Sequence, residues 1–328
     1  MEQKGKILVT GANGFLATNI VNALLESGYQ VRGLLRRKNS YAGPGHPGLE
    51  LVEGSFTDET ALSGAMEGCT AVIHSAACTS QSATEEDYRR INVEGVRTVF
   101  GTAVRSGIGR VVYISSANIF GYGTEDAPGD ESSPIRFPFT LSGYAVSKSA
   151  AQKVVDEFRD RLDIITLCPT FMLGPYGSRA GSCRIVLMCY RKKITFCPPG
   201  GKNFVAVKDV AKAATDALVQ GVPGEAYLIA GENLSYKEFY GIMSEMTGTK
   251  SVRIGLPASL MLFLGRIGDI LASAGLKTEL STANMRLLCI KNYYTAAKAA
   301  AGLGFHARPV REAVADTVSW FRRTGVLK

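Results

Sequence analysis

The chain has 328 residues, of which 46% are hydrophobic and 20% are charged, a composition typical of a folded globular protein and not of a disordered one. Its length allows one large domain with a smaller lobe. The net charge is +8, but the basic residues are scattered and are not interleaved with aromatic residues, so we expect no nucleic-acid partner. Scattered positive charge instead favours anionic small molecules, including a phosphorylated cofactor.

A glycine-rich turn follows the first predicted strand. The apolar run Ile7–Thr10 is separated from the helix pattern Phe15–Ser27 by Gly11-Ala12-Asn13-Gly14. Glycine lets the backbone approach phosphates, and the first N–H groups of a helix bind anions. The Gly-x-x-Gly-x-x-Ala spacing therefore predicts a dinucleotide site. Its predicted residues are Gly11, Asn13, Gly14, Phe15 and Leu16.

Short apolar runs alternate with amphipathic ones through the first half of the chain. This alternation predicts an α/β protein with a doubly wound parallel sheet, the Rossmann fold, over residues 1–168. The ligands of such a sheet lie at the carboxyl ends of its strands. The predicted strands are Ile7–Thr10, Gln30–Leu35, Leu49–Glu53, Ala71–Ser75, Arg110–Ser115 and Asp163–Cys168, and the helices between them are Phe15–Ser27, Glu59–Met66, Glu85–Ser106 and Tyr144–Arg161.

The regular alternation ends after Pro169. Residues 169–328 are expected to form mainly a smaller substrate-binding lobe, with segments around 204–230 returning to the Rossmann sheet. The apolar run Leu256–Leu264 is too short to span a bilayer. It predicts a lobe helix, and its contact with substrate or with a membrane surface stays open. Further predicted elements are strands Val205–Val207 and Ala226–Ala230 and helices Ile185–Arg191, Lys208–Gln220, Ser235–Met246 and Pro309–Arg323.

The seven cysteines form no Cys-x-x-Cys pair, and the chain has only three histidines. We therefore expect no metal site. Reduced thiols are typical of the cytoplasm, and the chain runs directly into its first strand without room for a signal peptide. A cytoplasmic location is the expectation that follows.

Three basic residues follow the second predicted strand. An acid at this position bonds the ribose 2′-hydroxyl of NAD, whereas arginine accommodates the 2′-phosphate of NADP. Here Leu35 is followed by Arg36, Arg37 and Lys38. Because cations bind a phosphate strongly, the sequence predicts NADP, with NAD less favoured. A solvated basic loop is the alternative.

A serine, a tyrosine and a lysine carry the predicted chemistry. The fifth strand ends in Ser115 and Ser116, and the next helix holds Tyr144 and Lys148 on one face, one turn apart. A phenol has an ordinary pKa of about 10, which a nearby ammonium lowers. Tyr144 is therefore the candidate acid/base, and a serine hydroxyl from the strand end is placed to polarise a carbonyl.

Seven motifs in this order resemble the extended short-chain dehydrogenase/reductase superfamily, which is NAD-dependent epimerase/dehydratase-like. The resemblance covers nearly the whole chain and is greatest to the dihydroflavonol-4-reductase-like and 3β-hydroxysteroid dehydrogenase-like branch. The motifs are Thr10-Gly11-x-x-Gly14-Phe15-Leu16-Ala17, Val72-Ile73-His74-Ser75-Ala76-Ala77, Asn92-Val93-x-Gly95, Val112-Tyr113-x-Ser115-Ser116 with Phe120-Gly121, Tyr144 with Lys148, Pro169-Thr170 with Gly174-Pro175, and Lys208-Asp209-Val210.

The resemblance implies a role for each site residue. Tyr144 is the implied acid/base, Lys148 lowers its pKa and bonds the nicotinamide ribose, and Ser116 orients the substrate oxygen. Asn92 supports the helix behind Lys148, although it is open to interpretation as a plain helix residue. The implied cofactor contacts also include Ser55, Phe56, Ser75, Ala76, Ala77, Pro169 and Thr170, and the implied substrate contacts are Ser116, Asn118, Phe171 and Met172.

Two positions depart from the family pattern. Ser55 stands where an aspartate usually meets the adenine, which puts that contact in doubt. Phe171 stands where sugar-nucleotide members usually carry asparagine. His74 is interpreted as a core residue rather than a catalyst.

The function predicted first is an NADP-dependent oxidoreductase that transfers hydride between the nicotinamide and a carbonyl/alcohol substrate. The alternatives are a nucleotide-sugar epimerase, which uses the same tyrosine and lysine for transient oxidation, and a non-catalytic NADP-sensing protein. A mainly apolar small-molecule substrate is favoured by Phe171, Met172, Leu173, Ile185, Leu187, Met188 and Leu260–Leu264, whereas Arg179, Arg184 and Arg191 suit a diphosphate or carboxylate. A homodimer is left open.

Overall fold

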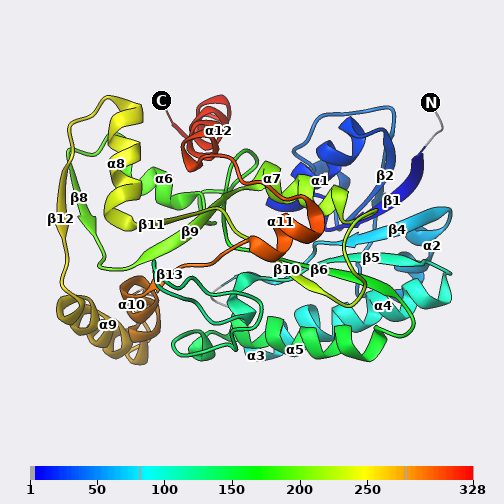
Figure 1. Ribbon diagram of the computed structural model, residues 1–328, viewed down its shortest axis with the longest axis horizontal. Coiled ribbons are helices and arrows are strands. Elements are labelled where there is room, and N and C mark those ends of the chain that lie inside the picture. Colours follow the sequence, from blue (N-terminus) through cyan, green and yellow to red (C-terminus); the bar gives the residue numbers. More distant parts are fainter. Residues whose placement is uncertain (1–3, 81–82, 277, 279, 328) are drawn as a thin grey trace.

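A computed structural model describes residues 4–80, 83–276, 278 and 280–327. Its larger part is a seven-stranded sheet in the order β3-β2-β1-β4-β5-β6-β10 (Figure 1). Every pairing in it is parallel, so the predicted doubly wound sheet is confirmed. The strands are β1 (Lys4–Thr10), β2 (Tyr29–Leu35), β3 (Leu49–Glu53), β4 (Cys69–His74), β5 (Arg110–Ile114), β6 (Asp163–Pro169) and β10 (Ala226–Ile229).

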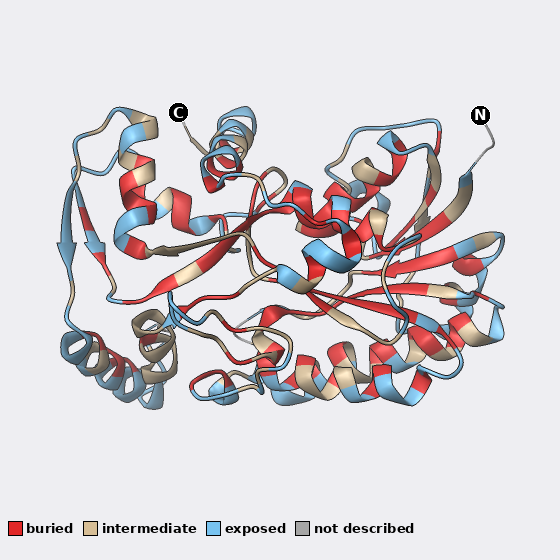
Figure 2. Ribbon diagram, in the orientation of Figure 1, coloured by how far each residue is buried: buried red, intermediate tan, exposed pale blue. Residues whose placement is uncertain are grey.

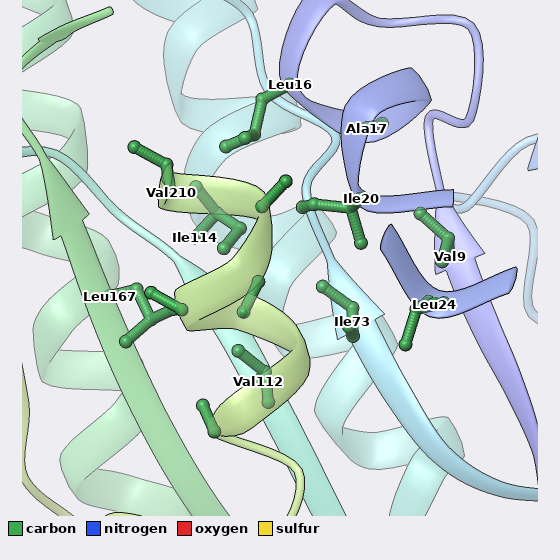
Figure 3. Packing of buried hydrophobic residues seen from close by; sticks show 14 of the residues in the cluster. Val9, Leu16, Ala17, Ile20, Leu24, Ile73, Val112, Ile114, Leu167 and Val210 are labelled. Atoms are coloured by element: carbon green, nitrogen blue, oxygen red, sulfur yellow. The ribbon is translucent and has the colours of Figure 1, made fainter. Parts of the chain in front are cut away.

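Helices cover both faces of this sheet because most of its strands are apolar on both sides. Leu16, Ile20 and Leu24 recur every four residues on the first helix, so they form one buried stripe on the sheet beside Val210 (Figure 3). That face carries α1 (Phe15–Glu26), α7 (Val207–Asp216) and α11 (Ala297–Leu303). The other face carries α2 (Glu59–Met66), α4 (Gly95–Arg105) and α5 (Gly143–Phe158).

Two predicted elements differ from the structure in more than the position of their ends. The single helix expected over Glu85–Ser106 is divided into α3 (Glu85–Tyr88), the π-helix η2 (Arg89–Glu94) and α4. The wider π-turn contains Asn92, whose buried side chain hydrogen-bonds groups outside the helix. Val207, predicted as the end of a strand, instead begins α7.

The lobe has a small sheet of its own, in which β9 pairs with β7, β11 and β13. Of the segment 204–230, α7 and β10 lie with the large sheet, while the end of β9 belongs to this small sheet. Phe204 of β9 stacks on Phe239 at a ring distance of 4.4 Å in the lobe core. The remaining strands are β7 (Phe171–Leu173), β8 (Ile194–Cys197), β9 (Gly201–Ala206), β11 (Glu232–Ser235), β12 (Val252–Gly255) and β13 (Lys291–Asn292). The lobe helices are α6 (Arg184–Cys189), α8 (Tyr236–Thr247), α9 (Ala258–Ser273), α10 (Thr282–Cys289) and α12 (Val310–Arg323).

The large sheet and the far end of the lobe differ in how deeply their residues are buried. The strands of the large sheet are mostly buried, whereas β12 and much of α9 at the far end of the lobe are exposed (Figure 2). All seven cysteines are free thiols. Within the described residues, no helix is long and apolar enough to cross a bilayer, and no group of three or more His, Cys, Asp or Glu side chains is placed to hold a metal ion.

Candidate active site

The glycine turn between β1 and α1 lies against the loop that follows β4. Gly11 has a φ of +66°, and a Cβ built on it would lie 3.0 Å from the Cβ of Ala76. A larger residue is therefore excluded by both backbone conformation and space. Gly14 occupies the N-cap position of α1, where no side chain caps the helix. An uncapped helix start behind a close glycine turn suits a phosphate group.

The turn is connected to the basic segment after β2. Asn13 Nδ2 donates a hydrogen bond to Ser40 Oγ at 3.0 Å. The side chains of Arg36–Lys38 are exposed and form no ion pair with any residue that the structure describes. Glu53, which sequence reasoning did not single out, accepts a hydrogen bond from the backbone N–H of Lys38 at 2.7 Å. Three cations thus stand free beside the glycine turn.

The segments after β3 and β4 hold the next predicted cofactor contacts. Ser55 lies beside Thr57, with their hydroxyl oxygens 2.7 Å apart. The ring of Phe56 packs on that of His74, 5.3 Å away. Ser75, Ala76 and Ala77 are half-buried in the loop after β4.

His74 itself lies in the core beneath this edge. Its Nδ1 is 2.8 Å from Thr10 Oγ1, and burial lowers the pKa of the imidazole to about 3. A neutral, buried imidazole held by a neighbouring strand fits the core role expected for it.

Lys148 is buried between α5 and β5, with 1% of its surface exposed. Its Nζ donates to the carbonyl oxygen of Ile114 at 2.9 Å and to the hydroxyl of Tyr113 at 3.3 Å. Burial lowers the pKa of this ammonium to about 8. Tyr113 was not predicted as a site residue, although its position on β5 places it on the face that α5 covers.

Tyr144 and Ser116 meet at the carboxyl end of β5. The nearby Ser116 hydroxyl acts to lower the pKa of the phenol. Burial acts more strongly in the opposite direction and raises that pKa to about 12. The ammonium of Lys148 is hydrogen-bonded to Tyr113 and Ile114, and its lowering of the Tyr144 pKa stays a prediction. Ser116 Oγ accepts from the backbone N–H of Asn118 at 3.3 Å.

Asn92 joins two segments of the site. Its Oδ1 accepts from the Cys78 backbone N–H at 2.7 Å, and its Nδ2 donates to the Cys78 carbonyl at 3.0 Å. The same Nδ2 donates to Ser147 Oγ at 2.9 Å. Because Ser147 directly precedes Lys148, Asn92 connects α5 to the loop after β4, and its role in positioning Lys148 stays a prediction.

A buried asparagine organises the substrate side. Thr170, just after β6, donates from Oγ1 to Asn203 Oδ1 at 2.6 Å. Asn203 also accepts from the Gly231 backbone N–H at 2.8 Å and donates to Asn233 Oδ1 at 2.7 Å. The segment predicted to lie near the nicotinamide, Pro169 and Thr170, is therefore tied to three strands of the molecule, β6, β9 and β11. Nothing in the linear sequence marks Asn203 for this role.

The first two residues of β7 are half-buried: Phe171 packs against the lobe core and Met172 against the core of the large sheet. The ring of Phe171 lies 5.0 Å from Lys202 Nζ. Burial lowers the pKa of Lys202 to about 8, and its ammonium has no hydrogen bond or ion pair within the described part of the chain. Phe171 and Met172 remain predicted substrate contacts, and Lys202 is an addition that sequence reasoning missed.

The run Leu260–Leu264 lies elsewhere. It belongs to α9, which packs on α10 at the far end of the lobe (Figure 1). A Cβ built on Gly265 would lie 2.8 Å from the Cα of Thr282, so the two helices are in close contact. Most of the other predicted site residues lie in the segments that follow β1 to β6, and the rest are Asn92 on η2, Tyr144 and Lys148 on α5, and Phe171 and Met172 on β7.

Comparisons with known proteins show the family of the chain. The sequence profile of the NAD dependent epimerase/dehydratase family matches residues 7–230. A Synechocystis sp. protein named as a dihydroflavonol 4-reductase is 30% identical over 98% of this chain and 95% of its own. Sterol demethylase protein B of Methylococcus capsulatus is 29% identical over 98% of this chain and 99% of its own. A 3β-hydroxysteroid dehydrogenase/Δ5→4-isomerase of Mycobacterium tuberculosis is 34% identical over 46% of this chain and 42% of its own.

Solved structures share the whole fold. The crystal structure of gox2253 superposes with a TM-score of 0.83 at 27% identity and covers 99% of this chain and 100% of its own. UDP-glucose 4-epimerase from Thermotoga maritima, at 20% identity, has a TM-score of 0.75 over 97% of this chain and 99% of its own. At 20% identity, the likeness to the Thermotoga maritima epimerase shows a shared fold and nothing about activity. The resemblance inferred from the seven motifs is confirmed by the family profile and by the reductase and dehydrogenase relatives.

Proposed function

This chain belongs to the NAD dependent epimerase/dehydratase family and is an oxidoreductase of the extended short-chain dehydrogenase/reductase type, and we propose that it reduces a mainly apolar carbonyl compound with NADPH. The observation that carries the proposal is the placement of Ser116, directly after β5, beside α5, which carries Tyr144 and, one turn further on, the buried Lys148. The ligands of doubly wound sheets lie at the carboxyl ends of their strands.

The proposed roles follow from the donors and acceptors present. Tyr144 would donate its phenolic proton to the substrate oxygen, while Ser116 Oγ hydrogen-bonds the same oxygen and orients it. When bound, the nicotinamide supplies the hydride that reaches the carbonyl carbon. An ammonium has three N–H donors, and the chain occupies two of those of Lys148. The third would bond the nicotinamide ribose.

The raised pKa of Tyr144 fits the direction of reduction. A phenol whose pKa is raised to about 12 stays protonated at neutral pH, so it is ready to act as an acid toward a carbonyl oxygen. In the oxidation direction the same group must first lose its proton. Reduction is therefore the direction we propose for neutral pH.

NADP(H) is proposed as the preferred cofactor because Arg36–Lys38 are exposed and unpaired within the described residues. The test is isothermal calorimetry with NADP⁺ and NAD⁺ on the same preparation. Tighter binding of NADP⁺ supports the proposal, and equal affinities contradict it.

The apolar substrate is proposed from Phe171 and Met172, which are half-buried on β7. Two of the relatives described above are named for sterol or steroid chemistry, which supports the same class. A buried apolar wall leaves sugar hydroxyls and phosphates without partners, so the epimerase alternative is disfavoured. The intact Ser116, Tyr144 and Lys148 set argues against a non-catalytic sensor.

The decisive experiment follows NADPH absorbance with a panel of apolar ketones, aldehydes and nucleotide sugars. Turnover of an apolar ketone, with none for UDP-sugars, supports the proposal. Epimerisation of a nucleotide sugar without net NADPH consumption would overturn it. The cytoplasmic location and the homodimer remain proposals, and light scattering of the purified protein tests the second.

A further inference from the structure

The strands β8 and β12 form a two-stranded ribbon with an apolar outer face. In their parallel register Val252 lies beside Ile194, and Ile254 lies beside Phe196. Side chains alternate between the faces of a strand, and Thr195 and Cys197 point to the buried side. All four apolar side chains are therefore on the solvent side, with exposed fractions between 41% and 62%. A soluble surface rarely gathers apolar residues in this way.

The helix α9 follows β12 directly in the chain and also exposes apolar side chains. Its packed side is formed by Met261, Gly265 and Gly268, which recur at helical spacing; Gly265 lies against α10 and Gly268 against Leu280, just before α10. The opposite side should be polar in an ordinary surface helix. It instead carries exposed large apolar residues. These are Leu260, Phe263, Ile267 and Ile270.

We call the outer face of the ribbon and the exposed side of α9 together the apolar end. It consists of Ile194, Phe196, Val252, Ile254, Leu260, Phe263, Ile267 and Ile270. Chain continuity keeps its two parts adjacent, because β12 ends at Gly255 and α9 begins at Ala258. Both parts lie at the tip of the lobe, away from the large sheet (Figure 1).

Basic side chains gather where the ribbon begins. Arg191, Lys192 and Lys193 precede β8, and Lys250 precedes β12. Because the strands are parallel, both groups lie at the same end of the ribbon. All four residues are exposed, and none forms an ion pair with the residues that the structure describes. Arg266 is also exposed, on the flank of α9.

We propose that the apolar end is a membrane-surface binding site that inserts its apolar side chains among lipid chains while the neighbouring cations contact anionic headgroups. Amphiphilic surfaces of this kind bind through buried apolar area plus attraction to anionic lipid. The charge pattern favours a lipid surface over a second copy of the chain. In a two-fold interface the patch would meet a copy of itself, and because the apolar end as defined contains no acidic residue, the four cations would find no counter-charge there.

The site requires no bilayer-crossing segment and does not depend on the proposed reaction. Its test is co-sedimentation of the purified full chain with vesicles of phosphatidylcholine alone or of an equal mixture of phosphatidylcholine and phosphatidylglycerol. We expect binding to the mixed vesicles that weakens with added salt. Absence of binding to the mixed vesicles would overturn the proposal.

Two pairs of substitutions separate the apolar contribution to vesicle binding from the electrostatic one. Phe263→Ser with Ile270→Ser should weaken binding about tenfold or more, because each side chain loses its burial in lipid. Lys192→Gln with Lys193→Gln should weaken it roughly fivefold per cation. The matched controls remove exposed residues elsewhere: Val219→Ser with Val222→Ser, and Lys153→Gln with Lys212→Gln. These controls should bind like the unmodified chain.

Two further outcomes decide against the proposal. Equal losses in the control pairs would mean that binding is not localised at the apolar end. A dimer in light scattering that Phe263→Ser with Ile270→Ser dissociates, without any change in vesicle binding, would assign the surface to a second copy. Circular dichroism and thermal melting establish that each variant folds, and because no step uses NADPH, failure here leaves the proposed reaction standing.

Discussion

The carboxyl edge of the large sheet and the apolar end of the lobe differ in how their side chains are held. At the sheet edge, Lys148 and Asn92 are buried, and their polar atoms are already hydrogen-bonded within the chain. At the apolar end, Phe196 and Ile270 project into solvent. The first region is preorganised before a ligand arrives, whereas the second lacks a partner. A reaction site needs catalytic groups held in a fixed geometry, as at the sheet edge. A binding surface needs exposed side chains, as at the apolar end.

The largest expected effect comes from the sheet edge. Tyr144→Phe removes the proposed proton donor, and loss of general acid catalysis typically costs ~10²–10⁴ in rate. We expect kcat for ketone reduction to fall by that factor while NADPH still binds in a fluorescence titration. Tyr122→Phe is the control, since its hydroxyl donates to the carbonyl oxygen of Phe137. A near-normal kcat in Tyr144→Phe would remove this residue from the mechanism.

The second largest expected effect is on cofactor preference and comes from the basic segment Arg36–Lys38. Arg36→Ala should reduce the preference for NADP⁺ over NAD⁺ by roughly 10- to 150-fold, because a charge-assisted hydrogen bond contributes about 1.5–3 kcal/mol. Calorimetry with both cofactors measures the ratio. Arg159→Ala, an exposed arginine at the end of α5, should leave it unchanged. If the ratio in Arg36→Ala is also unchanged, Arg37 or Lys38 carries the role instead.

Asn92→Ala tests whether the sheet edge is preorganised by this side chain. The change removes three hydrogen bonds and should lower the free energy of unfolding by about 1–3 kcal/mol, seen in urea denaturation. Below the melting temperature, kcat should fall more than the KM for ketone changes, because Lys148 loses its support. Asn22→Ala, which loses one bond to Tyr176, should do less. If the urea midpoint of Asn92→Ala equals that of the unmodified chain, this side chain does not preorganise the sheet edge.

The smallest effect concerns Lys202. Its folded pKa of about 8 lies below the usual value of 10.5, so the unfolded chain binds more protons between these pH values, and stability rises with pH across that window. Below about pH 8 the full cost of a buried charge is present. Lys202→Met should therefore raise the melting temperature at neutral pH by about 2–4 °C.

The pH dependence separates this effect from simple repacking. The gain in Lys202→Met should shrink between about pH 8 and pH 10.5, whereas exposed Lys153→Met should show no such trend. Differential scanning calorimetry at three pH values measures both. A gain that is independent of pH would mean that apolar packing against Phe171, and not removal of charge, causes it.

Sequence reasoning predicted the large sheet well because its signals are local. The six strands β1–β6 match their apolar runs closely, and α2 has the predicted bounds. The small sheet escaped prediction because β9 pairs with segments that are distant along the chain, as in the pairing of Lys202 with Leu234 and with Asn292. Short strands paired by tertiary contact leave little periodic signal.

In the candidate site too, features with a local sequence signal could be predicted, and features that depend on tertiary packing could not. The spacing of Tyr144 and Lys148 could be interpreted as a shared helix face, and the structure places both on α5. The partner of Lys148 could not be foreseen, because Tyr113 reaches it only once β5 and α5 are packed together. The raised pKa of Tyr144 also depends on burial, which spacing along a helix does not report.

The position of β10 has a consequence for how the chain folds during synthesis. This strand completes the large sheet at the edge of β6, yet it follows β7, β8 and β9 in the sequence. While residues 170–225 emerge from a ribosome, the backbone of β6 presents an open edge. Such edges pair readily with other chains. The nascent protein thus passes through an interval in which its catalytic half is nearly assembled but is most exposed to aggregation.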